Sequence, residues 1–315
     1  MIEISNLVKR YGKNYAVNDI SFNVNKGEIV GFLGPNGAGK STTMNILTGY
    51  LSATSGSVKI AGIDILENPI EAKKHIGFLP EHPPLYLDMT VKEYLGFVFD
   101  LKKCTYNKKK HIEEIVDVIN IGDVYKRPIA HLSKGYRQRV GIAQALISSP
   151  DILVFDEPTV GLDPRQIIEI RDLINSLGKT HTVILSTHIL PEVKAVCDRV
   201  VIINKGQLVA DAPTDELEAV TGVRKMKVKI CGPREGVLST LRGINGVTAA
   251  DVLPETDGDS FSYLVESDTG VDIRKPIFNA LAAKSYPMIG LESFSASLED
   301  VFIAIIDKNK NGGNN

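Results

Sequence analysis

A short glycine-rich segment near the N-terminus constrains the fold of this chain more than any other feature. It reads Gly34-Pro35-Asn36-Gly37-Ala38-Gly39-Lys40-Ser41 and fits the phosphate-binding pattern G-x-x-x-x-G-K-[ST]. Glycines allow a tight turn whose backbone N–H groups approach a phosphate closely, and a helix beginning near Lys40 adds its positive end. The Lys40 ammonium can reach the β- and γ-phosphates of a nucleotide, and the Ser41 hydroxyl can ligate Mg²⁺.

The residues on either side of this loop decide whether the match is more than a glycine-rich turn. The apolar run from Glu28 to Leu33 is typical of a strand, and Thr42 to Leu47 is typical of a helix. The strand–loop–helix arrangement is the context that the motif requires. We therefore predict that this loop binds the phosphates of a nucleotide.

Composition excludes several other classes of protein. The chain has 315 residues and a formal net charge of −2, so no general affinity for nucleic acid is expected. Its three cysteines are scattered and form no Cys-x-x-Cys pair, which argues against a disulfide framework or a zinc site and suits a reducing cytoplasm. We find no signal segment at the N-terminus and no apolar run near the roughly 20 residues that cross a bilayer. We expect a soluble chain.

The hydrophobic pattern predicts an α/β domain over residues 1–220. Residues 1–33 alternate apolar and polar positions and predict an antiparallel sheet, joined by a strand at 57–61. Residues 69–75 and 90–148 are expected to be largely helical. Strands and intervening helices are then expected at 152–155, 164–177, 182–186, 189–196 and 200–203. This alternation predicts a buried, mostly parallel sheet flanked by helices.

Residues 221–307 predict a second, smaller α+β domain. The order of expected elements is that of a split βαβ sandwich: strand 225–230, helix 234–242, strands 247–253 and 260–266, helix 272–284, strand 288–294 and a final helix at 297–306. The tail at 308–315 is rich in Asn and Gly, and we expect it to be disordered.

Two carboxylates follow the apolar run that ends at Phe155. Asp156 and Glu157 would lie at the carboxyl edge of a parallel sheet, where ligands bind in such folds. Asp156 is placed to hold Mg²⁺, and Glu157 can accept a proton from an attacking water molecule. The alternative is an exposed acidic pair that only ends a strand. The phosphate-binding motif with Lys40 upstream argues against this alternative.

A second anion site is expected at the start of a later helix. Ser133 is a good N-cap for the helix that carries Val140 and Ala143, and Gly135 leaves its first turn open. One molecule cannot easily direct two helix ends at one γ-phosphate from opposite sides. The second site therefore suggests a partner subunit.

Taken in order, these segments resemble the nucleotide-binding domain of ATP-binding cassette (ABC) proteins. The matching set is Tyr11, the loop at 34–41, LSKGYRQ at 132–138, VFDEP at 154–158, GLD at 161–163 and His188. The resemblance covers about residues 1–220. It implies a P-loop NTPase cassette with an antiparallel β subdomain and a helical subdomain, to which the small α+β C-terminal domain is added.

The resemblance also implies a role for individual residues. Tyr11 would stack on adenine, and Lys40, Ser41 and Thr42 would belong to the Walker A loop. Ser133 and Gly135 would contact the ATP held by the opposing subunit. Asp156 would bind magnesium and Glu157 would act as the base. Asp163 would link the two sites, and His188 would contact the γ-phosphate. Without this context, Tyr11 is an ordinary hairpin aromatic and His188 a polar residue closing a strand.

The chain departs from the family pattern at several positions. Glu81 stands where the family has a glutamine; a carboxylate only accepts hydrogen bonds and adds negative charge near phosphates, yet it can reach Mg²⁺ or its water. Lys134 and Tyr136 replace the usual glycine and glutamine of the signature, and Val160 replaces a common serine. Ser133 and Gly135 are retained, so the anion-binding geometry should persist.

These departures resemble one branch of the family. Leu79-Pro80-Glu81, Pro83-Pro84-Leu85-Tyr86, LSKGY and Ser297–Phe302 are similar to exporter ATPases that are chains separate from their membrane subunits, including gliding-motility, multidrug and antibiotic-resistance groups. The resemblance implies an ATPase that binds Mg-ATP at an interface with a second copy or a paralogue. It would power an integral membrane permease from the cytoplasmic face of the membrane. The residues apolar enough to supply a contact groove are Leu85, Tyr86, Leu87, Met89, Tyr94 and Phe97. The alternative for most of them is the core of the helical subdomain, which we expect for Tyr94 and Phe97.

Two alternatives belong to other classes. A soluble ABC-type ATPase acting on ribosomes or DNA would normally carry two cassettes or a long coiled-coil insert, and the interval from Lys40 to Ser133 holds no heptad pattern. The near-neutral charge also argues against a nucleic-acid partner. A small-molecule kinase would not account for LSKGY or His188.

Overall fold

The computed structural model describes residues 1–216, 223–268 and 271–294, and the chain divides into two compact units between Thr214 and Asp215. The domain boundary expected between 220 and 221 falls outside the described residues. The expected helix at 297–306 and the tail at 308–315 lie outside them as well. The larger unit holds two sheets and the smaller unit holds one, and each unit has its own hydrophobic core.

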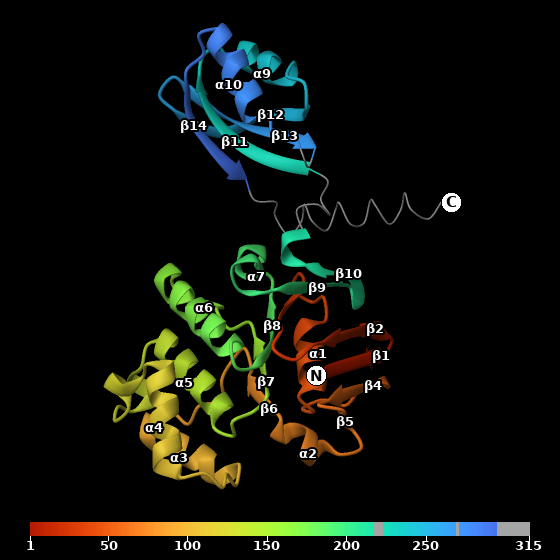
Figure 1. Ribbon diagram of the computed structural model, residues 1–315, viewed down its shortest axis with the longest axis vertical. Helices are drawn as coiled ribbons and strands as arrows, with labels where there is room; N and C mark the ends of the chain where they lie inside the picture. The colour runs from red at the N-terminus through yellow and green to blue at the C-terminus, as the bar shows by residue number, and fades with distance from the viewer. Residues whose placement is uncertain (217–222, 269–270, 295–315) are drawn as a thin grey trace. The chain divides into compact units, whose positions relative to one another are not determined.

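A six-stranded sheet runs through the larger unit (Figure 1). From edge to edge its strands are β10 (Gln207–Pro213), β9 (Arg199–Asn204), β3 (Ile29–Leu33), β8 (Thr182–Thr187), β7 (Ile152–Asp156) and β6 (Ile76–Leu79). Neighbouring strands are parallel, except that β10 is antiparallel to β9. Every residue of β3, β7 and β8 is buried, as expected for parallel strands covered on both faces.

The order of the parallel strands brings three loops to one edge. β8 lies between β3 and β7, with Leu33 paired to Thr187 and Ser186 paired to Asp156. Because parallel strands end at the same edge, the segments that follow them meet there. These segments are the glycine-rich loop after β3, Glu157 after β7 and His188 after β8.

A second sheet in this unit is antiparallel. Its strands, in order, are β2 (Asn14–Val24), β1 (Ile2–Tyr11), β4 (Ser55–Ile60) and β5 (Ile63–Asp64). The strand expected at 57–61 is confirmed as β4, which pairs with β1. The prediction that all of residues 1–33 belong to this sheet is wrong for β3. Five successive buried residues suit a strand covered on both faces, so β3 joins the parallel sheet instead.

Seven helices of the larger unit complete its layers, and the helices expected there are confirmed. They are α1 (Lys40–Leu47), α2 (Pro69–Lys74), α3 (Val91–Leu101), α4 (Lys108–Ile119), α5 (Lys134–Leu146), α6 (Pro164–Gly178) and α7 (Leu190–Val196), with 3₁₀ turns η1 (Gly122–Val124), η2 (Ile129–His131) and η3 (Thr214–Glu216). Figure 1 shows α3, α4 and α5 gathered on the side of the unit away from the antiparallel sheet. In the part of the chain that the structure describes, none of the helices has the length and apolar character to traverse a bilayer.

Side-chain caps fix where the functional helices begin. The Ser133 hydroxyl accepts a hydrogen bond from the Tyr136 backbone N–H at the start of α5, as the sequence predicts. At the start of α3, Thr90 and Glu93 form the expected capping box. Asp163 caps α6, and its carboxylate accepts from the Gln166 N–H at 2.9 Å.

In its described residues, the smaller unit is an antiparallel sheet packed against two helices. Its elements are β11 (Val223–Cys231), α9 (Arg234–Arg242), β12 (Val247–Asp257), β13 (Ser260–Asp268), α10 (Arg274–Ala283) and β14 (Met288–Phe294). The strand order is β12-β13-β11-β14, which is the pairing of a split βαβ sandwich. Met226, Val228 and Ile230 of β11 are buried in the core, and the lysines between them are only half-buried, so β11 alternates between its two faces.

Candidate nucleotide site

A cleft of about 430 Å³ lies at the edge of the sheet where β3, β7 and β8 end. It is lined by Ala16, Asn36, Gly37, Gly39, Lys40, Ser41, Thr42, Glu81, Glu157, Val160 and His188. Most of these residues were singled out in the sequence as binding or catalytic residues. The parallel topology therefore brings together residues as far apart in the chain as Ala16 and His188, at the expected edge of the sheet.

Two glycines of the loop cannot carry a side chain. Gly39 precedes α1 with φ of 111°, and a Cβ there would lie 2.3 Å from the Ala16 carbonyl oxygen. A Cβ on Gly34 would lie 2.4 Å from the Ile203 carbonyl oxygen. Both contacts are too short for any side chain, so the close approach of these backbones requires glycine.

The rest of the loop orders the Lys40 side chain. The Lys40 ammonium donates to the carbonyl oxygens of Gly34, at 2.9 Å, and Pro35, at 3.4 Å. The Ala38 N–H donates to the Pro35 carbonyl at 3.1 Å and closes the turn. The cation is therefore held by carbonyl oxygens of the loop that precedes α1.

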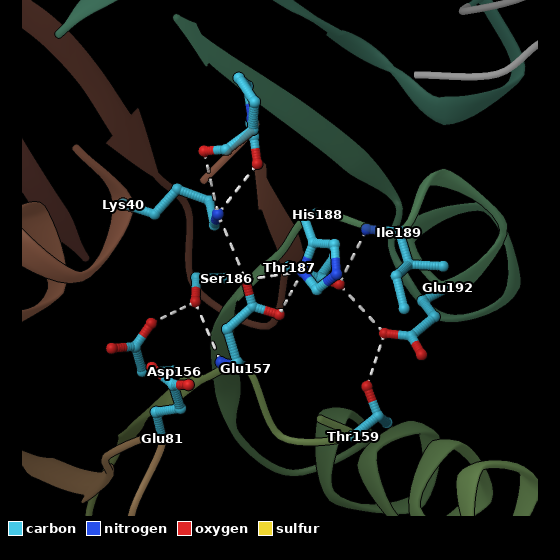
Figure 2. Close-up of polar contacts among 12 residues, drawn as sticks. Lys40, Glu81, Asp156, Glu157, Thr159, Ser186, Thr187, His188, Ile189 and Glu192 are labelled. Carbon is cyan, nitrogen blue, oxygen red and sulfur yellow. Dashed lines mark hydrogen bonds and ion pairs between the residues drawn. The ribbon is translucent and has the colours of Figure 1, made fainter. Parts of the chain in front are cut away.

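The two carboxylates at the end of β7 are both buried but have different partners. Asp156, 3% exposed, accepts hydrogen bonds from the hydroxyls of Ser41 at 3.2 Å and Ser186. Glu157, 6% exposed, lies 3.2 Å from the Lys40 Nζ and 3.0 Å from the His188 Nδ1. Figure 2 shows the side chains of Lys40, Glu157 and His188 directed toward one another.

Burial raises the pKa of the Asp156 carboxyl above its ordinary value of 3.8. Hydrogen bonds from Ser186 and Ser41 favour the ionised form and oppose this rise, while the nearby carboxylates of Glu157 and Glu81 add to it. The site thus concentrates negative charge beside Ser41. A cation near Ser41 and Asp156 would relieve that charge.

Ser186 is a site residue that sequence reasoning missed. It is fully buried near the end of β8. Its hydroxyl donates to Asp156 and accepts from the Glu157 backbone N–H at 3.0 Å, so it joins the two acidic residues (Figure 2). The available signal is the pair of hydroxyl residues, Ser186 and Thr187, directly before His188.

Ser133 and Gly135 do not line the first cleft. They line a second cleft of about 510 Å³ with Asn120, Tyr136, Arg139, Asp163, Arg165, Gln166, Glu169 and Ile170. A Cβ on Gly135 would lie 2.8 Å from the Gln166 Cδ. The open first turn of α5 therefore lies directly beside the start of α6.

Of two further predicted residues, Glu81 lines the first cleft and Tyr11 does not. Glu81 lines the cleft, and its carboxylate lies 3.9 Å from the His82 Nδ1. Tyr11 pairs with Asn14 at the end of the β1–β2 hairpin and is 52% exposed. Ala16, which was not predicted, lines the cleft where Tyr11 does not.

Comparisons with known proteins show the family to which this chain belongs. The ABC transporter family matches residues 17–160. A bacitracin transport ATP-binding protein of Bacillus licheniformis is 39% identical over 220 residues, which cover 69% of this chain and 71% of that protein. A linearmycin resistance ATP-binding protein of Bacillus subtilis is 34% identical over 258 residues, covering 80% of this chain and 83% of that protein.

A solved structure extends the likeness to the fold. It is a dimeric ATP-binding cassette in a post-hydrolysis state bound to ADP and Pi, with a TM-score of 0.61 and 26% identity, covering 68% of this chain and 99% of that one. The relatives are transporter proteins, so the alternative of a soluble ATPase acting on ribosomes or DNA is not supported. This chain belongs to the ABC transporter family and is an ATP-binding, ATP-hydrolysing subunit of a transporter.

Proposed function

We propose that two copies of this chain, or one copy and a paralogue, hold two ATP molecules between them and use hydrolysis to drive a separate membrane permease. The observation that carries this proposal is the separation of the two clefts. Lys40 and Glu157 line one, and Ser133 and Gly135 line the other. A two-fold dimer presents the same surfaces twice, so the second cleft of each copy can complete the first cleft of its partner.

In this proposal each ATP is bound from both sides. The backbone of residues 34–39, the N-terminus of α1 and the Lys40 ammonium bind its phosphates. The N-terminus of α5, with Ser133 and Gly135 of the other copy, contacts the γ-phosphate. Tyr11 would stack on the adenine ring, for which its exposed side chain is accessible.

The donor set beside the loop fits a magnesium ion. Ser41 and Asp156 supply a hydroxyl and a carboxylate whose oxygens are 3.2 Å apart, and Glu81 adds a further carboxylate at the margin of the cleft. In the part of the chain that the structure describes, no group of three or more His, Cys, Asp or Glu side chains could hold a metal ion. Mg²⁺ takes few protein ligands and completes its shell with phosphate oxygens and water. When bound, the ion neutralises charge on the phosphates.

Hydrolysis would depend on Glu157 and His188. Glu157 can accept a proton from the water that attacks the γ-phosphate. The His188 Nδ1 lies within hydrogen-bonding distance of both Glu157 carboxylate oxygens, at 3.1 and 3.0 Å, which leaves its Nε2 for the γ-phosphate. Because one chain carries both residues, a homodimer would have two competent sites.

The membrane partner and the cargo are proposed from the relatives. Their names, bacitracin transport and linearmycin resistance, support export of antibiotics by a permease that this subunit serves from the cytoplasmic face of the membrane. Tyr86 and Leu87 are exposed beside α3, as a contact groove requires, whereas Tyr94 is buried in the core. A pull-down from detergent-solubilised membranes should recover a multi-span protein. Recovery of only soluble proteins would count against this assignment.

A mixing experiment tests the shared sites. The Lys40→Ala variant lacks a functional first cleft, and the Gly135→Asp variant places a carboxylate and a Cβ into the second. Each alone should be inactive. In a mixed dimer, one of the two sites combines an intact first cleft with an intact second cleft. After equal amounts are mixed, about half of the dimers are mixed dimers and each has one intact site of two, so about a quarter of wild-type turnover should return.

The outcome separates two arrangements. If both clefts served one ATP within a single chain, the mixture would be as inactive as its components. The Glu157→Gln variant gives a second measurement, because it keeps the shape of the base without its charge. It should form an ATP-dependent dimer on size-exclusion chromatography with light scattering, and a persistent monomer at saturating Mg-ATP would contradict the proposal.

A further inference from the structure

A buried carboxylate next to the site has no role in the mechanism described above. Glu192, in α7, is only 3% exposed. Its Oε2 accepts hydrogen bonds from the hydroxyls of Thr159, at 2.6 Å, and Thr187, at 3.1 Å, as Figure 2 shows. The Thr187 hydroxyl also accepts from the Ile189 backbone N–H at 3.1 Å. Its hydrogen is therefore directed to Glu192, and its lone pair is directed to the backbone.

These bonds join the two loops that carry the reactive residues. Thr159 is two positions after Glu157, and Thr187 directly precedes His188. The two loops follow different strands, β7 and β8. One oxygen of Glu192 thus joins the loop after β7 to the last residue of β8, which directly precedes His188.

The backbone of Glu157 needs such support. Its φ is 49°, in the left-handed region that costs a non-glycine residue free energy unless its surroundings hold it there. Ser186 holds the residue on one side through the Glu157 N–H, at 3.0 Å. The Thr159–Glu192 bond holds the loop two residues further on.

Arg171 of α6 supplies the counter-charge. Its guanidinium lies 3.7 Å from the Glu192 Oε1, the oxygen that does not take part in the threonine bonds. A buried carboxylate without such a partner would be strongly disfavoured. The two oxygens of Glu192 therefore have separate tasks, one toward the threonines and one toward Arg171.

We propose that Glu192 is a positioning residue, which holds Glu157 and His188 in the relative placement that hydrolysis requires. The proposal rests on the roles proposed above for Glu157 and His188. Glu192 does not touch the nucleotide cleft, so it acts through the two loops. Loss of the bonds should therefore impair turnover more than ATP binding.

Substitutions at Glu192 separate its two tasks. Glu192→Ala removes both sets of contacts. Glu192→Gln keeps a carbonyl oxygen that can accept hydrogen bonds from both threonines. Its NH₂ group, however, replaces the carboxylate oxygen that faces the Arg171 guanidinium, so a hydrogen-bond donor would face another donor. We expect Glu192→Ala to lower kcat by about tenfold or more with KM for ATP changed less than about twofold, because a 1 Å misplacement can cost roughly a hundredfold in rate. Glu192→Gln should keep most of kcat and lose stability.

The threonines give an independent measurement that preserves volume. Thr159→Val and Thr187→Val each remove one donor and should each lower kcat with little change in KM. Adding either to Glu192→Ala should lower kcat no further, because residues in one network are not additive. These variants remain informative if Glu192→Ala does not fold.

Glu28→Ala is the matched control. Glu28 is also a largely buried carboxylate paired with an arginine, Arg199, at 2.8 Å, but it lies at the opposite end of β3 from the cleft. It should lower Tm without changing kcat. The full-length chain is used throughout, with steady-state turnover, nucleotide binding and thermal unfolding measured for every variant.

Three results would overturn the proposal. Wild-type kcat in Glu192→Ala would do so, as would unchanged kcat in both valine variants. A rise in KM with kcat retained would assign Glu192 to binding instead. Glu157→Gln is measured in parallel. Normal ATP hydrolysis by this variant would contradict the proposed role of Glu157. If Glu157→Gln is inactive while the Glu192 and threonine variants hydrolyse ATP normally, only the proposal for Glu192 is contradicted.

Discussion

The two clefts of the larger unit differ in how their chemistry is held. In the first, Lys40 and His188 each lie within 3.2 Å of Glu157, and the carboxylates of Asp156 and Glu157 are almost fully buried. In the second, the Ser133 hydroxyl caps its own helix, and Gly135 offers open backbone beside Gln166. The first cleft depends on charged groups with fixed partners, whereas the second depends on the space left by a missing side chain. Substitutions should therefore act through charge in one and through volume in the other.

The largest expected effect tests the charged cleft. Glu157→Gln should lower kcat by roughly 10²–10⁴-fold, the usual contribution of a positioned base, with little change in KM. Steady-state hydrolysis measures both constants. Glu71→Gln, on an exposed helix surface, should leave them unchanged. A drop of only a few-fold in Glu157→Gln would mean that the base lies elsewhere.

A second variant of the same cleft separates catalysis from stability. Burial raises the pKa of Asp156 above 3.8, so its ionised form is disfavoured in the folded chain. Below the ordinary pKa of Asp156 this carboxyl costs the folded chain no stability. The free energy of unfolding then falls as pH rises from that value through the raised pKa of Asp156. Asp156→Asn should impair turnover and raise Tm relative to wild type, by an amount that increases from acid to neutral pH.

Thermal unfolding of both proteins at several pH values measures this difference. A Tm difference that does not vary with pH would show that the Asp156 charge carries no penalty in the folded chain. Turnover of Asp156→Asn near the wild-type rate would remove Asp156 from the proposed magnesium site.

The second cleft should respond to volume instead. In Gly135→Ala the new Cβ meets the Gln166 Cδ at 2.8 Å, which narrows the cleft that the partner's nucleotide is proposed to enter. We expect a rise of about fivefold in the ATP concentration for half-maximal turnover, the factor that about 1 kcal/mol provides, with kcat nearly retained. Titration of turnover with ATP measures this.

Gly96→Ala is the control for that variant. Gly96 lies inside α3, and its new Cβ would only approach the Lys108 Cε at 3.5 Å, an ordinary contact. The substitution should stabilise the helix by about 0.5–1 kcal/mol and leave turnover unchanged. If Gly135→Ala behaved in the same way, the second cleft would not contribute through its open backbone.

The smallest effect on turnover is expected far from both clefts. Burial lowers the pKa of Lys102 to about 8, and its amine donates to the Gln144 carbonyl oxygen and the Ser148 hydroxyl. Folding then disfavours the charged form, so stability rises with pH between about 8 and the ordinary value of 10.5. Lys102→Met should lose that pH dependence and keep its turnover. An identical rise in the variant would contradict the assignment.

Much of the first cleft could be predicted because its signals are local. The loop at 34–41 needs glycine where the backbone meets Ala16 and Ile203, and Asp156 follows an unbroken apolar strand. Helix caps such as Ser133 could also be predicted, because a cap depends on residues within about four positions of it in the chain.

Other features were missed because nothing local marks them. β6 has only four residues and β10 is a half-exposed edge strand, so each is defined by its pairing rather than by its pattern. β3 was assigned to the wrong sheet because the alternation of apolar and polar residues in β2 was assumed to continue into β3.

The amino-acid sequence alone determined which residue types could bind a nucleotide and in what order they occur, because backbone turns, caps and strand ends depend on neighbours in the chain. Tertiary structure alone decided which of them meet. Ser186 joins the Asp156 carboxylate to the Glu157 backbone N–H, and Glu192 joins the loop after β7 to the end of β8, only because β7 and β8 lie side by side. It also separated Ser133 from Lys40 into different clefts, since helix position in a folded layer depends on packing between distant segments.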